Sequence, residues 1–198
     1  MKLRLLVVLC VLTSIMSAQN FPMEAKVSSL QFHTARTSDD ALATALEIMF
    51  RNRAVCCSKE SSLVDVVARA NPANLQDVAT KLQGRHVLGD GRPIQVSATF
   101  YPTTPTNGSL PASSYILSTL LSDHPLLMQW KGKLYVVHGA NYTQQVINSD
   151  SVRSALDIID TLFLFEPVTG EQTTFNRVSD NWNEVQGVLA VSATWSSS

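Results

Sequence analysis

The chain has 198 residues, of which 45% are hydrophobic and 16% are charged, and its formal net charge is −1 at pH 7. This length suits one domain with a sizeable hydrophobic core. A net charge this small, with both signs mixed along the chain, argues against nucleic acid or an anionic membrane as the binding partner.

The first 18 residues have the pattern of a secretory signal peptide. Two basic residues precede an apolar run over residues 5–16, and the small residues Ser17 and Ala18 follow it. The run is too short to span a bilayer comfortably, although a buried N-terminal helix is an alternative interpretation. We therefore expect cleavage after residues 1–18 and a secreted or periplasmic protein. The mature chain, residues 19–198, is expected to form a single domain without a membrane segment.

Helices are predicted in the first half of the mature chain. Ser38 is a suitable N-cap, and Asp39 and Asp40 suit the positive end of a helix dipole. A third helix is expected to begin at about Asn74 and to stop at Gly84. Apolar residues recur at helical spacing in three segments: Leu42, Ala45, Leu46, Met49 and Phe50, then Leu63, Val66, Val67 and Ala70, then Leu75, Val78, Ala79 and Leu82.

In the second half, the spacing of apolar residues changes to that of strands. A half-buried strand is predicted over 94–100, and one more helix over 111–124. Later strands are expected in the segments PLLMQW, KLYVVHGANY, TLFLFEP, EQTTFN and QGVLAVSATW. Helices followed by a largely antiparallel sheet predict an α+β fold, with the N-terminal helices packed on the C-terminal sheet.

Cysteines are few. Cys10 leaves with the signal peptide, and only the adjacent pair Cys56 and Cys57 remains. Two cysteines cannot form a disulfide framework, and no CxxC or HxxxH spacing supplies further metal ligands. The chain also has no phosphate-binding glycine loop, so we predict neither a metal nor a cofactor. The pair is interpreted as structural, as a redox feature or as a reactive thiol, and all three remain open.

Two residues are candidates for nucleophilic catalysis. Cys57 stands just before the second predicted helix, and a helix N-terminus and the nearby Lys59 both favour a thiolate. His138 follows an apolar run and precedes Gly139, so it is the candidate base; a histidine that closes a strand is also commonly structural. The other histidines are typical of solvated positions: His33, His86 and His124. Two triplets match the N-glycosylation pattern: Asn107-Gly108-Ser109 and Asn141-Tyr142-Thr143.

Four short segments between residues 110 and 191 follow one another in a recognisable order: HPLLMQW, KLYVVHGANY, LFLFEPVTG and DNWNEVQGVLAVS. In this order they resemble segments of the papain-like, C39-like cysteine peptidases of secreted bacterial proteins. The resemblance implies a papain-like fold. In that family the nucleophilic cysteine opens the first core helix, and the catalytic histidine precedes an aliphatic strand.

Both catalytic positions are replaced if the resemblance holds. The family's cysteine position falls near Asp40, and its histidine position falls on Leu134. Neither side chain can do the chemistry, so the resemblance implies a degenerate, non-catalytic member that binds a peptide or protein partner in the cleft between helices and sheet. The alternative hypothesis is a thiol-dependent cysteine peptidase that uses Cys57 and His138, with Glu166 as the third residue.

Overall fold

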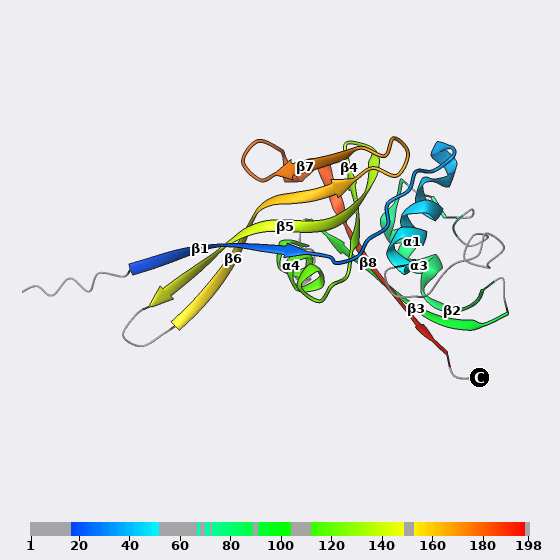
Figure 1. The fold of residues 1–198 in the computed structure, drawn as a ribbon, viewed down its shortest axis with the longest axis horizontal. Coiled ribbons are helices and arrows are strands. Elements are labelled where there is room, and N and C mark those ends of the chain that lie inside the picture. The colour runs from blue at the N-terminus through cyan, green and yellow to red at the C-terminus, as the bar shows by residue number, and fades with distance from the viewer. Residues whose placement is uncertain are drawn as a thin grey trace, which may run out of the picture.

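A computed structural model describes residues 17–51, 67, 70–71, 73–88, 91–103, 112–148 and 153–196. The part it describes is an eight-stranded antiparallel sheet with helices on both faces (Figure 1). The predicted α+β class is confirmed. Residues 1–16 of the predicted signal peptide, the pair Cys56 and Cys57, and most of the predicted helix over 63–70 lie outside the described residues.

Eight strands, three α-helices and two short 3-10 helices make up the described part of the chain. The helices are α1 (Ala41–Arg51), α3 (Leu75–Leu82), α4 (Ala112–Leu121), η1 (Ser38–Asp40) and η2 (Trp182–Glu184). The strands are β1 (Ser17–Lys26), β2 (Gly84–Val87), β3 (Pro93–Pro102), β4 (Leu126–Trp130), β5 (Lys133–Asn148), β6 (Arg153–Phe165), β7 (Gln172–Asn176) and β8 (Val185–Trp195). Their order is β2-β3-β8-β4-β5-β6-β7, and β1 pairs with β5. None of the described helices is both long and apolar enough to cross a membrane.

The two faces of the sheet carry separate hydrophobic clusters. Side chains alternate between the faces of a strand, so in β5 Val136 packs with α1 and α3, whereas Tyr135 and Val137 pack with α4. The apolar stripe predicted for the first helix is fully buried on the α1 face: Leu42, Ala45, Leu46, Met49 and Phe50. Burial of these residues against the sheet stabilises α1 and fixes which face it covers.

Several predicted boundaries are wrong. Ser38 belongs to the 3-10 helix η1, and Thr37 occupies the cap position without a side-chain cap. Residues 19–26, for which no strand was predicted, belong to β1. Strand β5 continues to Asn148, so His138 lies inside a strand and does not close it. These strand segments depend on long-range pairing, because β1 and the far half of β5 pair with each other along their length.

A three-stranded arm extends from the body of the molecule (Figure 1); it consists of residues 17–24 of β1, 141–148 of β5 and 153–161 of β6. Phe21, Met23 and Leu156 on the arm are large apolar residues with 44%, 46% and 56% of their surface exposed. Among the described strands β1 pairs with β5 alone, and Pro22, opposite Thr143, has no N–H to offer a further strand at the outer edge of β1. This proline hinders another strand from pairing there.

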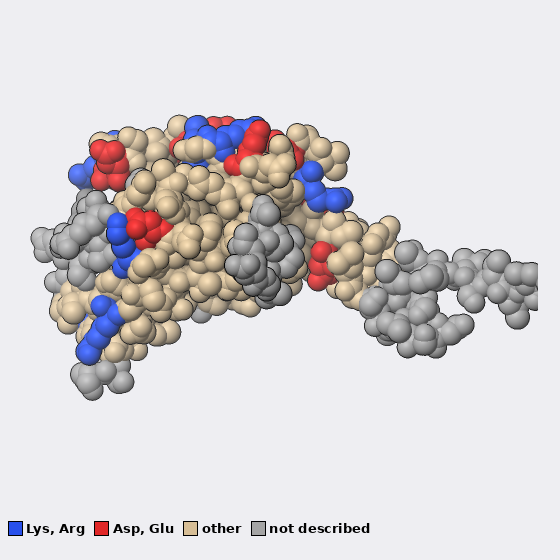
Figure 2. All heavy atoms as spheres, turned by 180° about the vertical axis from the view of Figure 1, so that it is seen from behind, with Lys and Arg blue, Asp and Glu red and all other residues tan. Residues whose placement is uncertain are grey.

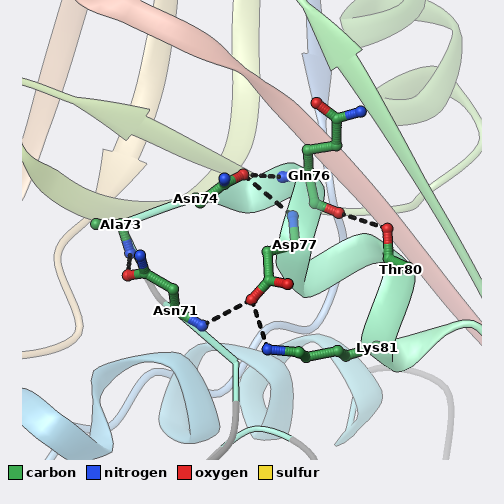
Figure 3. A network of polar contacts seen from close by, with 7 residues as sticks. All are labelled: Asn71, Ala73, Asn74, Gln76, Asp77, Thr80 and Lys81. Carbon is green, nitrogen blue, oxygen red and sulfur yellow. Dashed lines mark hydrogen bonds and ion pairs between the residues drawn. The ribbon is translucent and has the colours of Figure 1, made fainter.

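Helix α3 begins with a side-chain cap (Figure 3). The Asn74 Oδ1 accepts hydrogen bonds from the backbone N–H groups of Gln76 and Asp77, both at 3.1 Å. Asp77 Oδ2 in turn accepts from Lys81 Nζ at 2.8 Å and from the Asn71 backbone N–H at 3.0 Å. The bonds from Lys81 and Asn71 lower the pKa of Asp77. The network satisfies backbone donors that a helix N-terminus leaves unpaired.

Replacing Asn74 by alanine is expected to lower the free energy of unfolding by about 1 kcal/mol, because the cap bonds to two backbone donors are lost. Equilibrium unfolding in urea measures this loss. Lys81→Ala is the matched control, since it removes an exposed ion pair that contributes little to stability. Equal losses in the two variants would show that the cap contributes nothing beyond the ion pair.

Candidate functional site

His138 lies at a β-bulge in the middle of β5. Val137 pairs with Leu164 and Gly139 pairs with Phe163, so His138 is the extra residue. Such a bulge places two consecutive side chains on one face of the sheet. Gly139 makes this arrangement fit, because a Cβ there would lie 2.7 Å from Cδ2 of the Phe163 ring.

The bulge marks the point where β5 changes partner. Lys26, the last residue of β1, pairs with Gly139, and Leu126, the first residue of β4, pairs with Val137. The Val27 N–H donates to the His138 carbonyl at 2.9 Å, which closes the junction between the two partner strands. His138 therefore has a structural position, at the junction of β1, β4 and β5.

The imidazole of His138 is enclosed by aromatic rings. Its side chain is 9% exposed, and its ring centroid lies 5.0 Å from that of Phe32 and 6.2 Å from that of Phe163. Burial, and then the charge of Lys26, lower its pKa from 6.5 to about 4. In the described part of the chain, no carboxylate lies within ion-pair distance of this ring. His138 is thus neutral at pH 7, a weak base without the acidic partner that orients a catalytic histidine.

Glu166 follows β6 and lies on the other side of the sheet from His138. Its carboxylate accepts a hydrogen bond from the Thr169 hydroxyl and lies 3.6 Å from Lys133 Nζ. Burial first, then the charges of Glu166 and Glu171, raise the pKa of Tyr135, which belongs to the α4 cluster. The preceding residue, Phe165, instead packs with the α1 cluster and stacks on Phe32. The structure therefore does not bring His138 and Glu166 together.

The other sequence-predicted residues fall into different surroundings. Asp40 is exposed at the end of η1, where it accepts a hydrogen bond from the Thr37 hydroxyl at 3.0 Å. Leu134 is half-buried at the start of β5 and packs against the α1 cluster. Cys57 lies outside the described residues. Asp40 thus precedes α1, and Leu134 faces the side of the sheet that α1 covers.

Charged side chains on the face seen in Figure 2 gather along its upper edge, where both signs adjoin. Around the turn between β4 and β5, Lys131 Nζ lies 3.9 Å from Asp180 and 3.7 Å from Glu184. It also lies 4.5 Å from the centroid of the Trp130 ring. These exposed pairs contribute little to stability and leave no large surface of one sign among them.

A groove of about 320 Å³ lies on the α4 face of the sheet, where α4 stands beside β3 and β8. Its floor includes Ser97 and Ser192, which are directly paired across β3 and β8. Six hydroxyl-bearing Ser and Thr residues line it, together with Tyr115 and His124: Ser97, Thr99, Ser118, Thr119, Ser122 and Ser192. None of the described side chains that line it is Asp, Glu, Lys or Arg. We call this feature the hydroxyl groove.

The position of α4 creates the hydroxyl groove. Ile116, Leu117 and Leu120 of α4 are buried against the sheet, and the hydroxyl-bearing side of the helix turns toward β3. The rings of Tyr101 and Tyr115 stack with centroids 3.4 Å apart and hold β3 to α4. Burial, and then the hydrogen bond with Tyr115, raise the pKa of Tyr101 to about 12. This groove was not predicted, although the polar faces of β3, β8 and α4 carry Ser and Thr in regular spacing.

In the described part of the chain, the neutral His138 and the hydroxyl groove are the two features that bear on function. Among the residues that the structure describes, no three His, Cys, Asp or Glu side chains gather closely enough to hold a metal ion. No family model, no curated protein and no solved structure matches the chain.

Proposed function

We propose that the chain is a secreted, non-catalytic binding protein of papain-like architecture, and that it holds an extended peptide segment of a partner protein in the hydroxyl groove. One observation carries the proposal: an open groove between a helix and the sheet is lined by hydroxyl groups, and none of the described side chains along it is Asp, Glu, Lys or Arg. Export rests on the predicted signal peptide, residues 1–18. The papain-like architecture rests on the resemblance of the second half of the chain.

The surroundings of the candidate catalytic residues support a non-catalytic role. A catalytic base needs a pKa near the working pH and a partner that orients its ring. His138 is neutral among aromatic rings, and Glu166 bonds to Thr169 on the other side of the sheet. Asp40 and Leu134 occupy the positions that the family resemblance assigns to the thiol and the base, and neither can replace them.

The chemistry of the groove favours a peptide with uncharged polar side chains. Each peptide group offers one hydrogen-bond donor and one acceptor, and each Ser or Thr hydroxyl can serve either. The groove lies on a face of the sheet, where the floor residues of β3 and β8 pair with each other. We therefore assign binding to the side chains of the floor and of α4. A charged peptide side chain would lose water without gaining an opposite charge.

The test is selection of ten-residue peptides from a library on the full chain, followed by titration of the selected peptide. Thr99→Lys is expected to weaken its binding at least tenfold, or about 1.4 kcal/mol, because the new side chain fills the groove and brings an unpaired charge. Thr174→Lys is the matched control. Thr174 is an exposed residue of β7, which lies at the far end of the strand order from β3 and β8. Selection of no peptide, or equal weakening by both variants, would contradict the proposal.

A further inference from the structure

One face of the arm, on the side of the sheet that α1 covers further along, is bare as far as the described residues go, because none of the residues in the α1 cluster lies on the arm. Asn141 lies on the middle strand β5 at the base of the arm, between Glu24 of β1 and Thr161 of β6. Leu156 and Ile158 of β6 point to the same face, because they pair with odd-numbered residues of β5. Leu156 is 56% exposed on this face.

Asn141 is the exposed residue between two buried ones. Ala140 and Tyr142 are 0% and 4% exposed because both face the α4 cluster, so Asn141 projects from the opposite face. Asn141, Tyr142 and Thr143 form the acceptor triplet for N-glycosylation, in which the hydroxyl two residues after the asparagine is required. In the folded arm the Thr143 hydroxyl donates to Asp160 at 2.7 Å. The triplet must therefore react before the arm folds, during export.

We propose that Asn141 carries an N-linked glycan in cells that glycosylate exported chains, and that this glycan covers the bare face of the arm. The inference rests on the export part of the proposed function and is independent of the hydroxyl groove. The sugar donor is a lipid-linked oligosaccharide diphosphate. Nδ2 of Asn141 forms a bond to C1 of the first sugar, the bond from C1 to the phosphate oxygen breaks, the lipid diphosphate leaves, and a base takes the amide proton.

The glycan shields apolar surface that the arm exposes. Both faces of the arm carry exposed apolar side chains, Phe21 and Met23 on one and Leu156 on the other. Exposed sheet of this kind promotes association between chains, and Pro22 protects only the outer edge of β1. A bulky, hydrated glycan at the base of this face, four residues of β5 from the position that pairs with Leu156, keeps other chains away from it.

Translation of the full chain in the presence of endoplasmic-reticulum microsomes tests the modification. We expect a protease-protected product whose added mass is removed by peptide N-glycosidase, with conversion of Asn141 to aspartate. The Asn141→Gln and Thr143→Ala variants should lose the modification at this site, whereas Thr143→Ser should keep it because a hydroxyl remains. Asn107→Gln removes the other acceptor triplet and should leave the modification at Asn141 unchanged.

A protected product with an unmodified Asn141 overturns the inference. A product that protease degrades also overturns it, by showing that the chain is not exported; peptide binding in the hydroxyl groove is then still measurable on the purified chain. A separate measurement tests whether the glycan covers the arm. Enzymatic removal of the glycan should increase the fluorescence of an apolar dye, and Leu156→Ser should reduce that increase. An unchanged signal after removal shows that the glycan does not cover this face.

Discussion

Replacing Gly187 by alanine is expected to lower the free energy of unfolding by about 3 kcal/mol. Gly187 lies on β8, between β3 and β4 in the centre of the sheet. An added Cβ would lie 2.4 Å from the backbone oxygen of Tyr101 and 2.6 Å from two ring carbons of Phe100. The Phe100 ring can move, but the Tyr101 carbonyl is fixed by the strand. The methyl group therefore forces β3 and β8 apart, and urea unfolding measures the result.

Gly132→Ala is the control for this prediction. Gly132 lies in the turn between β4 and β5 with a φ of +74°, and a Cβ there would meet no atom within 4 Å. Only backbone strain opposes that substitution, so we expect a loss of about 1 kcal/mol. If Gly187→Ala lowers the free energy of unfolding no more than Gly132→Ala does, β3 and β8 do not lie as close together at Gly187 as the structure places them.

Acidification from pH 7 to pH 4 is expected to remove about 2 kcal/mol of stability through His138 alone. The pKa of His138 is lowered from 6.5 to about 4 in the folded chain, so between these values the unfolded chain binds a proton that the folded chain does not. The free energy of unfolding therefore falls as the pH falls through this window. The stability that is lost in this window is fully present above pH 6.5, where His138 is neutral in both the folded and the unfolded chain. The facing charge is Lys26, at the end of β1.

The variant His138→Phe isolates this effect. A phenyl ring keeps the packing against Phe32 and Phe163 but cannot take a proton. The difference in unfolding free energy between the native chain and the variant, measured by urea unfolding at several pH values, should change steeply between pH 6.5 and pH 4. His86→Gln controls for the loss of an imidazole elsewhere. A difference that stays constant with pH would mean that His138 is accessible to water.

The elements that were predicted correctly are those whose conformation is determined mainly by their own residues. The helical spacing from Leu42 to Phe50 identified the buried face of α1, and the alternation from Ile94 to Phe100 identified β3. Strand β1 was missed although Phe21, Met23 and Ala25 alternate with other residues, because Pro22 argues against a strand; pairing with β5 determines its conformation. The far half of β5 was missed because most of its residues after Tyr142 are polar.

The candidate site was predicted less well than the fold. His138, Glu166 and Leu134 were located on the correct strands or next to them, but one sequence cannot show that His138 and Glu166 lie on different sides of a sheet. The bulge at His138 depends on pairing with Phe163, 25 positions along the chain. The hydroxyl groove could not be foreseen either. Ser97 and Thr99 have the pattern of an ordinary solvent-facing strand edge until α4 is placed beside them.

The fate of a bound peptide tests the central claim, binding without catalysis, most directly. The peptide selected on the full chain is incubated with it under reducing conditions, the complex is isolated, and the peptide is identified by mass spectrometry. We expect the intact peptide, bound to the native chain and to Cys57→Ala alike, and weakened binding in Thr99→Lys. Cleavage that requires a reducing agent and disappears in Cys57→Ala would contradict the claim and establish the peptidase hypothesis instead.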